Sequence, residues 1–506
     1  MAQHLMILSL VRPVLDHTST SASSDSPFST HWVAACLAVY FLVAIGWAVG
    51  KQMRKKRKTL YYRVAKFFGN DSLKKLQYHV KTYPGYDLAS VNRAITSFLS
   101  ECCTTQESLG FVHFDELRDL IESERGSYIQ KQKPGAVGYT RVFVNLGVEE
   151  SITSNCIYIC QSNLKDSEKP DKLLICIQTM SAHVNVEEDM GEQSAPMTSL
   201  KVTVACESRQ RADGTFAELE ERRKRLSVYR GKVIDPVVNA GGIRSIAFKR
   251  IARVGKDDLI LPPTVLDLIK ASIIDFYRHQ DVLRSVGVEM KRGILFHSPP
   301  GTGKTSIGLY LAGLLPDFTV CFVSGRKLLY PREICSMARY LQPAMVVFED
   351  IDLIANERDL NGLATVLGEL MNQIDGCEPN DQVLFVMNTN SMERLEQAVR
   401  DRPGRVDQII QIPLPDEEYR AKLIRRFARN LEVGEGAVEQ LAAASGGTTP
   451  ATLKEVVKRA AVLAVTAGHA SSNGSQQVNV ASADLMLALA QVHARRERRK
   501  EADEVL

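Results

Sequence analysis

Apolar positions change their spacing several times along the chain, and the first marked change is an unbroken run. Trp32 to Gly50 contains no charged residue. As a helix these 19 residues would extend about 28 Å, close to the ~30 Å hydrocarbon core of a bilayer. The pattern therefore predicts one transmembrane helix over 32–50, preceded by an extracytoplasmic tail over 1–31.

A basic segment follows this run, and helix-spaced apolar positions follow the basic segment. The positive charges are Lys51, Arg54, Lys55, Lys56, Arg57 and Lys58. Such a flank places its end of the span, and the rest of the chain, on the cytoplasmic side. LKKLQYHV and LASVNRAITSFLSE carry apolar residues at helical spacing. We therefore expect a basic juxtamembrane and helical segment over 51–130.

Short strand-like runs replace the helical spacing in the next segment. TRVFVNLG, NCIYICQS, KLLICIQTM and LKVTVACES are rich in β-branched and aromatic residues and are separated by polar turns. Residues 131–252 are thus predicted to form a small α+β or β-rich domain. No set of carboxylates, cysteines and histidines suggests catalysis there, which favours an adaptor role.

Residues 253–412 alternate buried strands with helices, which predicts an α/β module with a parallel sheet flanked by helices. Residues 413–506 have apolar positions at helical spacing, which predicts a helical lid. A basic tail follows within the same range. Inside the α/β module, Ile294 to Phe296 read as a strand, SIGLYLAGLL reads as a helix, and a glycine-rich turn joins them. A glycine-rich turn between a strand and a helix is typical of a phosphate-binding loop, so this turn is a candidate for one.

The candidate loop supplies groups that suit a nucleoside triphosphate with Mg²⁺. Backbone N–H groups curl around phosphate oxygens at the positive end of the following helix. Lys304 is expected to reach the β- and γ-phosphates, and the Thr305 hydroxyl is expected to ligate Mg²⁺. Ser298 stands where the usual pattern has a glycine. The candidate binding residues are Ser298, Pro299, Pro300, Gly301, Thr302, Gly303, Lys304, Thr305 and Ser306.

Candidate catalytic residues follow three later segments. Glu349 and Asp350 end the apolar strand 344–348, where carboxylates hold Mg²⁺ and orient water. Asn390 ends the strand over 383–387 and can reach a phosphate or the attacking water. Arg402 and Arg405 lie in RDRPGRVD, and arginine suits the charge of a transferring phosphoryl group.

Composition narrows the function classes. A formal charge of +4 over 506 residues does not favour nucleic acid as a partner. The ten cysteines include no CxxC pair, which argues against a zinc-binding site. The sequence also lacks the HExxH motif of one type of zinc peptidase. Reduced, partly buried thiols are expected.

Taken together, SPPGTGKT, VVFEDID, the TN pair and RPGRVD resemble the AAA (AAA+) ATPases, as does the lid segment GTTPATLKEVVKRAA. The likeness covers about 253–466. With the anchor, it is similar to FtsH-like proteins without their protease half, and to mitochondrial AAA proteins that assemble respiratory complex III. The resemblance implies Glu349 as the Mg²⁺-linked carboxylate, Asp350 as the catalytic carboxylate and Asn390 as sensor 1.

It further implies that Arg402 and Arg405 act on a neighbouring subunit's ATP in a ring, usually a hexamer. The family order of the two carboxylates is inverted here, so which of them is the base stays open. In the family a pore aromatic grips substrate; Tyr330 is a candidate for that role and equally for a core residue.

These observations favour a membrane-anchored ATPase with ATP and Mg²⁺ that remodels or assembles an unknown protein. The alternatives are an ATP-gated, non-hydrolysing scaffold and a nucleic-acid motor. The expected location is a bacterial plasma membrane with the ATPase in the cytoplasm, or the mitochondrial inner membrane with the ATPase in the matrix.

Overall fold

The computed structural model describes most of the chain, in two compact units. The described residues are 39, 41–51, 59–111, 116–122, 133–162, 171–182, 197–239, 242–355, 363–393, 395, 406–467 and 478–504. One unit comprises 1–76 and 109–136, and the other comprises 77–108 and 137–506. Each unit is described by itself.

The first unit is mostly helical where it is described, and Gly110 and Gly135 form an isolated antiparallel β-bridge in it. Its helices are 41–51, α3 (Leu60–Phe68), α4 (Asn70–Leu73) and α6 (Leu117–Glu122). Thr59 caps α3 by accepting a hydrogen bond from the Tyr62 N–H at 3.3 Å. The predicted span 32–50 lies partly outside the described residues. Among the residues that the structure describes, no helix has the length and apolar content needed to cross a bilayer.

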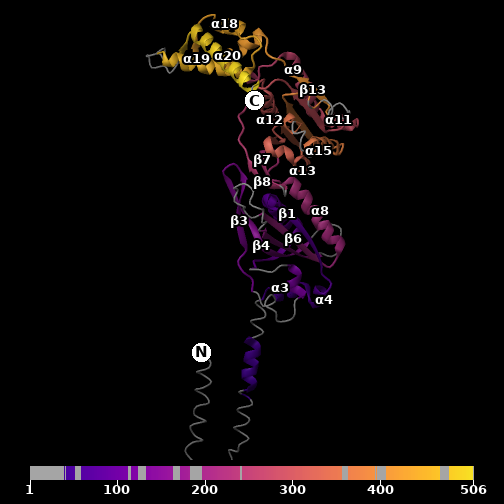
Figure 1. The fold of residues 1–506 in the computed structure, drawn as a ribbon. Coiled ribbons are helices and arrows are strands. Elements are labelled where there is room, and N and C mark those ends of the chain that lie inside the picture. The colour runs from indigo at the N-terminus through magenta and orange to yellow at the C-terminus, as the bar shows by residue number, and fades with distance from the viewer. Residues whose placement is uncertain are drawn as a thin grey trace, which may run out of the picture. The chain divides into compact units, whose positions relative to one another are not determined.

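The second unit begins with a β-rich domain built on a six-stranded sheet (Figure 1). Its strands run in the order β1-β6-β5-β4-β2, with β3 pairing β4. The elements are β1 (Gln77–Pro84), η1 (Gly85–Asp87), α5 (Leu88–Cys102), β2 (Cys103–Leu109), β3 (Gly138–Asn145), β4 (Val148–Ser162), β5 (Asp171–Ala182), β6 (Met197–Cys206) and α8 (Arg209–Arg225). Helices α5 and α8 pack against each other and share one apolar core with this sheet. The four strands predicted over 131–252 are confirmed as β3 to β6.

The helical prediction for 51–130 is wrong at two places. The second half of LKKLQYHV begins β1, and β2 follows directly after α5. The spacing of Leu73, Leu76 and Val80 suits a helix, but β1 pairs antiparallel with β6, from Gln77 opposite Cys206 to Pro84 opposite Ser199. A partner more than a hundred residues away thus overrides the local pattern.

The α/β module has a seven-stranded sheet in the order β13-β9-β12-β11-β10-β7-β8. All its pairs are parallel except β7 with β8. The strands are β7 (Val233–Asn239), β8 (Gly242–Phe248), β9 (Arg292–His297), β10 (Thr319–Val323), β11 (Ala344–Phe348), β12 (Val383–Thr389) and β13 (Gln408–Gln411). The helices are η2 (Lys256–Asp258), α9 (Pro263–Ile269), η3 (Lys270–Asp275), α10 (Phe276–Arg278), α11 (Gln280–Ser285), α12 (Lys304–Leu314), η4 (Gly325–Leu329), α13 (Pro331–Tyr340), α14 (Asp352–Ala355) and α15 (Leu363–Asp375).

The structure moves one predicted boundary. Residues 233–248 were expected to belong to the β-rich domain that ends at 252. Instead, β7 pairs with β10 in the α/β sheet, where Val320 lies opposite Val233 and Cys321 opposite Ile234. The sheet thus extends to β7 and β8, and the α/β module begins before 253.

A helical lid follows the α/β module, as predicted (Figure 1). It comprises α17 (Glu417–Phe427), β14 (Leu431–Val433), α18 (Ala437–Ala444), α19 (Pro450–Thr466), β15 (Val478–Val480) and α20 (Ser482–Glu504). Helices α19 and α20 pack together around a core that includes Leu453 and Leu485. Asp416 and Thr449 cap α17 and α19, which fixes where these helices begin.

Candidate active site

The predicted phosphate-binding loop has the expected strand, turn and helix. Strand β9 ends at His297 and α12 begins at Lys304. Gly301 and Gly303 have φ of +86° and +107°, in the left-handed region that favours glycine. A Cβ at Gly301 would also lie 2.9 Å from the Ala451 Cβ of the lid. The loop therefore needs its glycines both for its path and for the approach of the lid.

Lys304 is buried and holds the loop together. Its Nζ donates to the Ser298 carbonyl at 2.8 Å and to the Asn390 Oδ1 at 2.8 Å. It also lies 3.1 Å from the Ser298 hydroxyl, so the serine that replaces a glycine supplies an extra acceptor. Burial lowers the pKa of Lys304, while nearby carboxylates, Asp350 foremost, oppose the shift.

Glu349 lies at the end of β11 beside the start of α12. Its Oε2 accepts from the Thr305 hydroxyl at 3.0 Å and from the Asn388 amide at 3.1 Å. Its Oε1 is buried and has no hydrogen-bond partner among the described residues. A buried carboxylate oxygen without a donor, next to a hydroxyl, fits a divalent cation such as Mg²⁺. The two residues predicted to bind metal are thus brought together.

Asp350 faces a different partner. The Asn390 Nδ2 donates to its Oδ1 at 2.7 Å, so Asn390 bridges Asp350 and Lys304. Asp350 has a φ of +52°, which is uncommon for a residue with a side chain and typical of strained functional positions. The two adjacent carboxylates therefore have separate surroundings, one beside Thr305 and one beside Asn390.

Two residues without a predicted role support this arrangement. Asp352 is buried and accepts from the Asn390 N–H and from the Thr389 hydroxyl, both at 3.0 Å, so it fixes the backbone that carries Asn390. Asn388 is fully buried and donates to Glu349. For Asn388 the sequence signal is a polar residue near the end of the apolar strand β12, whereas Asp352 begins α14 and has no such signal.

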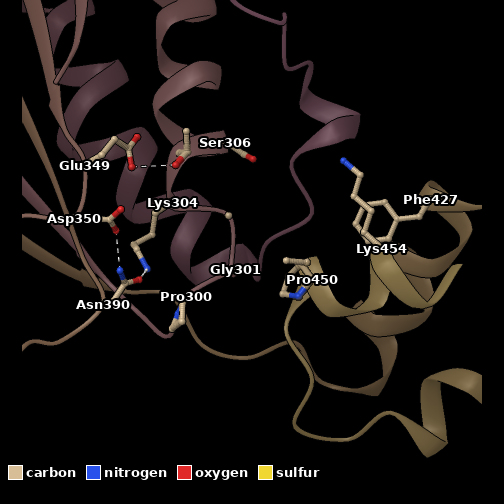
Figure 2. A pocket seen from close by; sticks show the side chains of 13 residues that line it. Pro300, Gly301, Lys304, Ser306, Glu349, Asp350, Asn390, Phe427, Pro450 and Lys454 are labelled. Carbon is tan, nitrogen blue, oxygen red and sulfur yellow. Dashed lines mark hydrogen bonds between the residues drawn. The ribbon is translucent and has the colours of Figure 1, made fainter. Parts of the chain in front are cut away.

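These groups line a cavity of about 470 Å³ (Figure 2). The α/β module contributes Pro300, Gly301, Gly303, Lys304, Thr305, Ser306, Glu349, Asp350 and Asn390, and the lid contributes Phe427, Pro450, Ala451 and Lys454. The lid also bonds to the loop directly, because the Ala451 N–H donates to the Gly301 carbonyl at 3.0 Å. Phe427 and Lys454 were not predicted as pocket residues, although Lys454 lies in the segment GTTPATLKEVVKRAA that resembles the lid of the AAA ATPases.

The remaining predicted residues are less informative. Ser298 and Thr302 are buried and hydrogen-bonded to each other, which makes them structural parts of the loop. Arg402 and Arg405 lie outside the described residues. Tyr330 is half-buried between η4 and α13.

Comparison with known proteins gives a consistent result. Residues 294–414 match the profile of the ATPase family associated with various cellular activities (AAA). The chain is 32% identical over 235 residues to a 26S proteasome regulatory subunit 8 homolog of Schizosaccharomyces pombe, which covers 42% of this chain and 55% of that protein. It is 28% identical over 242 residues to the proteasome-activating nucleotidase of Sulfurisphaera tokodaii, covering 45% of this chain and 59% of the relative.

A third relative is named as a protease. The chain is 32% identical over 240 residues to the ATP-dependent zinc metalloprotease FtsH 1 of Symbiobacterium thermophilum, covering 44% of this chain and 40% of that protein. The matched segments therefore span only about half of each chain.

Proposed function

We propose that this chain, which carries an ATPase domain of the AAA family, binds ATP with Mg²⁺ and hydrolyses it to ADP and phosphate. One observation carries the proposal: Lys304, Asn390 and Asp350 form a continuous hydrogen-bonded set, and Glu349 lies with Thr305 in the same cavity. The names of the relatives, a nucleotidase and an ATP-dependent metalloprotease, agree with it.

The arrangement assigns a role to each side chain. The loop N–H groups and Lys304 bind and orient the triphosphate. Thr305 and Glu349 would hold Mg²⁺, which when bound neutralises charge on the phosphate oxygens. Asn390 positions the attacking water, and Asp350 accepts its proton, because Asp350 is the carboxylate that is not engaged by Thr305. The proposal therefore assigns the metal to Glu349 and the proton transfer to Asp350.

A pair of substitutions tests the separation of the carboxylates. Glu349→Gln is expected to raise the Mg²⁺ concentration for half-maximal ATPase activity by roughly tenfold or more, because a charged metal ligand is lost. Asp350→Asn is expected to lower kcat by about 10²-fold or more with the Mg²⁺ requirement unchanged, because only the proton acceptor is lost. ATPase titrations with Mg²⁺ measure both. If Glu349→Gln instead lowers kcat and Asp350→Asn raises the Mg²⁺ requirement, Glu349 is the base.

Phe427 is an aromatic residue that the lid contributes to the cavity, and we expect it to contact the base of the nucleotide (Figure 2). Stacking of a base on an aromatic ring contributes about 1–3 kcal/mol. Phe427→Ala should therefore raise the Kd for ATP by roughly tenfold, whereas Phe427→Tyr should leave it near the wild-type value. Titration with a fluorescent ATP analogue measures both constants. Equal affinities for the alanine and wild-type proteins would place the base elsewhere.

Arginines in trans would make the active form a ring. Arg402 and Arg405 are proposed to contact ATP on a neighbouring subunit, in a homo-oligomer for which a hexamer is the first expectation. Since the named relatives include proteasome subunits and a protease, we propose that hydrolysis remodels or assembles a protein substrate. The non-hydrolysing scaffold remains an outcome of the same assays: ATP binding without phosphate release by the wild-type chain at any protein concentration.

We also propose that residues 32–50 anchor the chain in a membrane, with the ATPase in the bacterial cytoplasm or the mitochondrial matrix. The uncharged run beside six basic residues supports this. The full chain is expected to stay in the pellet when membranes are extracted with alkaline carbonate, and a chain lacking 32–50 is expected in the supernatant. Release of the full chain by carbonate would contradict the anchor.

A further inference from the structure

Three thiols gather where α5 meets the sheet of the β-rich domain. Cys102 ends α5 and Cys103 begins β2. Cys160 is on β4, which is the neighbour of β2 in the sheet. Cys160 belongs to the core cluster beneath the helices, Cys103 packs against that cluster, and the Cys160 thiol donates to the Leu173 carbonyl of β5 at 3.8 Å.

Two arginines of α8 surround these thiols. The Arg222 Nη2 lies 3.2 Å from the Cys102 Sγ. The Arg211 Nη2 donates at 3.2 Å to the hydroxyl of Ser162, which faces the same side of β4 as Cys160 because it is two residues further along the strand. Carboxylates also face the arginines: Glu101 and Glu218 pair with Arg222 at 2.6 and 2.8 Å, and Asp171 pairs with Arg211 at 2.8 Å.

The two partners of the pair differ in access and in acidity. Cys103 is half-buried, whereas Cys160 has no exposed surface. The interaction with the Cys160 side chain lowers the pKa of Cys103 against the opposing effect of burial, and the two arginines add to the lowering. The same interaction and burial raise the pKa of Cys160. Among the described residues no group of three acidic, histidine or cysteine side chains could hold a metal, so a metal site does not explain the cluster.

We propose that Cys103 and Cys160 are an oxidation-sensitive dithiol, with Cys103 as the thiol that a peroxide attacks and Cys160 as the thiol that resolves the product. The Cys103 thiolate attacks hydrogen peroxide, the O–O bond breaks, and a sulfenic acid and hydroxide form; the hydroxide takes a proton to become water. The Cys160 sulfur then displaces the second oxygen as water, giving a disulfide. Overall, one peroxide and two thiols yield one disulfide and two waters.

Cys102 is not the expected partner of Cys103 in this reaction. It is adjacent in sequence, but its sulfur lies against Arg222, whereas Cys160 lies on β4, the neighbour of β2, in the core cluster against which Cys103 packs. A bond between Cys103 and Cys160 would join the start of β2 to β4 and so fix the end of α5 against the sheet. A dithiol of this kind is reversible in a compartment that holds thiol reductants.

The test uses the full chain in mild detergent and Cys377 as a matched control. Cys377 is also a half-buried thiol, but burial raises its pKa. At neutral pH, iodoacetamide is expected to label Cys103 roughly tenfold faster than Cys377. After hydrogen peroxide, peptide mass spectrometry should find a Cys103–Cys160 disulfide that dithiothreitol removes.

Serine variants identify the roles. In Cys160→Ser, dimedone should trap a sulfenic acid on Cys103, whereas Cys103→Ser should give neither the disulfide nor the adduct, and Cys102→Ser should behave as the wild type. The proposal is overturned if wild-type Cys103 reacts no faster than Cys377, or if its disulfide partner is Cys102. The wild-type measurements decide the matter even where a variant does not fold.

Discussion

Lys304→Ala is expected to abolish detectable ATP binding and to reduce kcat/KM for ATP by about 10³-fold or more. The ammonium group is buried at the centre of the cavity, where it contacts Ser298 and Asn390 and where charge interactions are strong. Loss of one preorganised donor to a transferring group costs about 10²–10³ in kcat, and weaker binding adds to that loss. Isothermal titration calorimetry and phosphate release by the full chain measure the two effects.

A lysine outside the cavity provides the control for this experiment. Lys422 lies on α17, is exposed, and pairs with Glu418 at 2.6 Å. Lys422→Ala should leave ATP binding and turnover unchanged. Thermal unfolding of both variants without nucleotide checks that each is folded. Retention of wild-type phosphate release by folded Lys304→Ala would show that the cavity in Figure 2 is not the hydrolytic site.

The double variant Arg402→Ala/Arg405→Ala is expected to keep its affinity for ATP and to lose kcat by roughly 10³-fold or more. The reason is that an arginine supplied in trans stabilises the charge of the transition state and contributes little to the ground state. Turnover per subunit of the wild type should also rise with protein concentration until rings form. Loss of affinity in proportion to activity would instead place these arginines within their own subunit's binding site.

Mixing the two inactive proteins gives the sharpest test. Lys304→Ala subunits cannot bind ATP but retain both arginines, and the double arginine variant binds ATP but lacks them. Mixed rings therefore contain interfaces in which every group is present, and activity should rise well above that of either protein alone. Arg425→Ala, at an exposed ion pair with Glu439 on the lid, is the control and should be fully active. Absence of complementation in verified mixed oligomers would exclude action in trans.

The sequence was most informative where chemistry and local structure coincide. The loop from Ser298 to Thr305 needs left-handed glycines, and those glycines are visible in the sequence. The central strands β9 to β12 are continuous apolar runs because both faces are covered, so they were also predictable. The predictions failed at β1 and β2 and in the placement of β7, because β1 pairs with β6 and β7 pairs with β10, which lie far away in the sequence.

The site was predicted for the residues that a motif contains and not for those that folding brings in. Glu349 and Asp350 were identified as a pair, but the sequence does not reveal that Thr305 lies beside one of them and Asn390 beside the other. Asp352 acts through the backbone of Asn390, which no local pattern reveals. Phe427 and Lys454 reach the cavity only because the lid packs on the loop, a contact that depends on Gly301 and Ala451.

The place of β7 and β8 limits how this chain can exchange domains during evolution. A recombination event at 252/253 would separate the α/β module from its two outermost strands and expose the edge of β10, and exposed edges promote aggregation. The alternative junction, between α8 and β7, contains Val228 and Tyr229, which are buried in a core that Ala89 of α5 shares. Arg223 of α8 also pairs with Asp87, and its guanidinium lies 4.3 Å from the ring centre of Tyr340 on α13. We therefore expect the β-rich domain and the ATPase module to be inherited together. A β-rich domain of this kind should occur only in front of an ATPase module that retains β7 and β8.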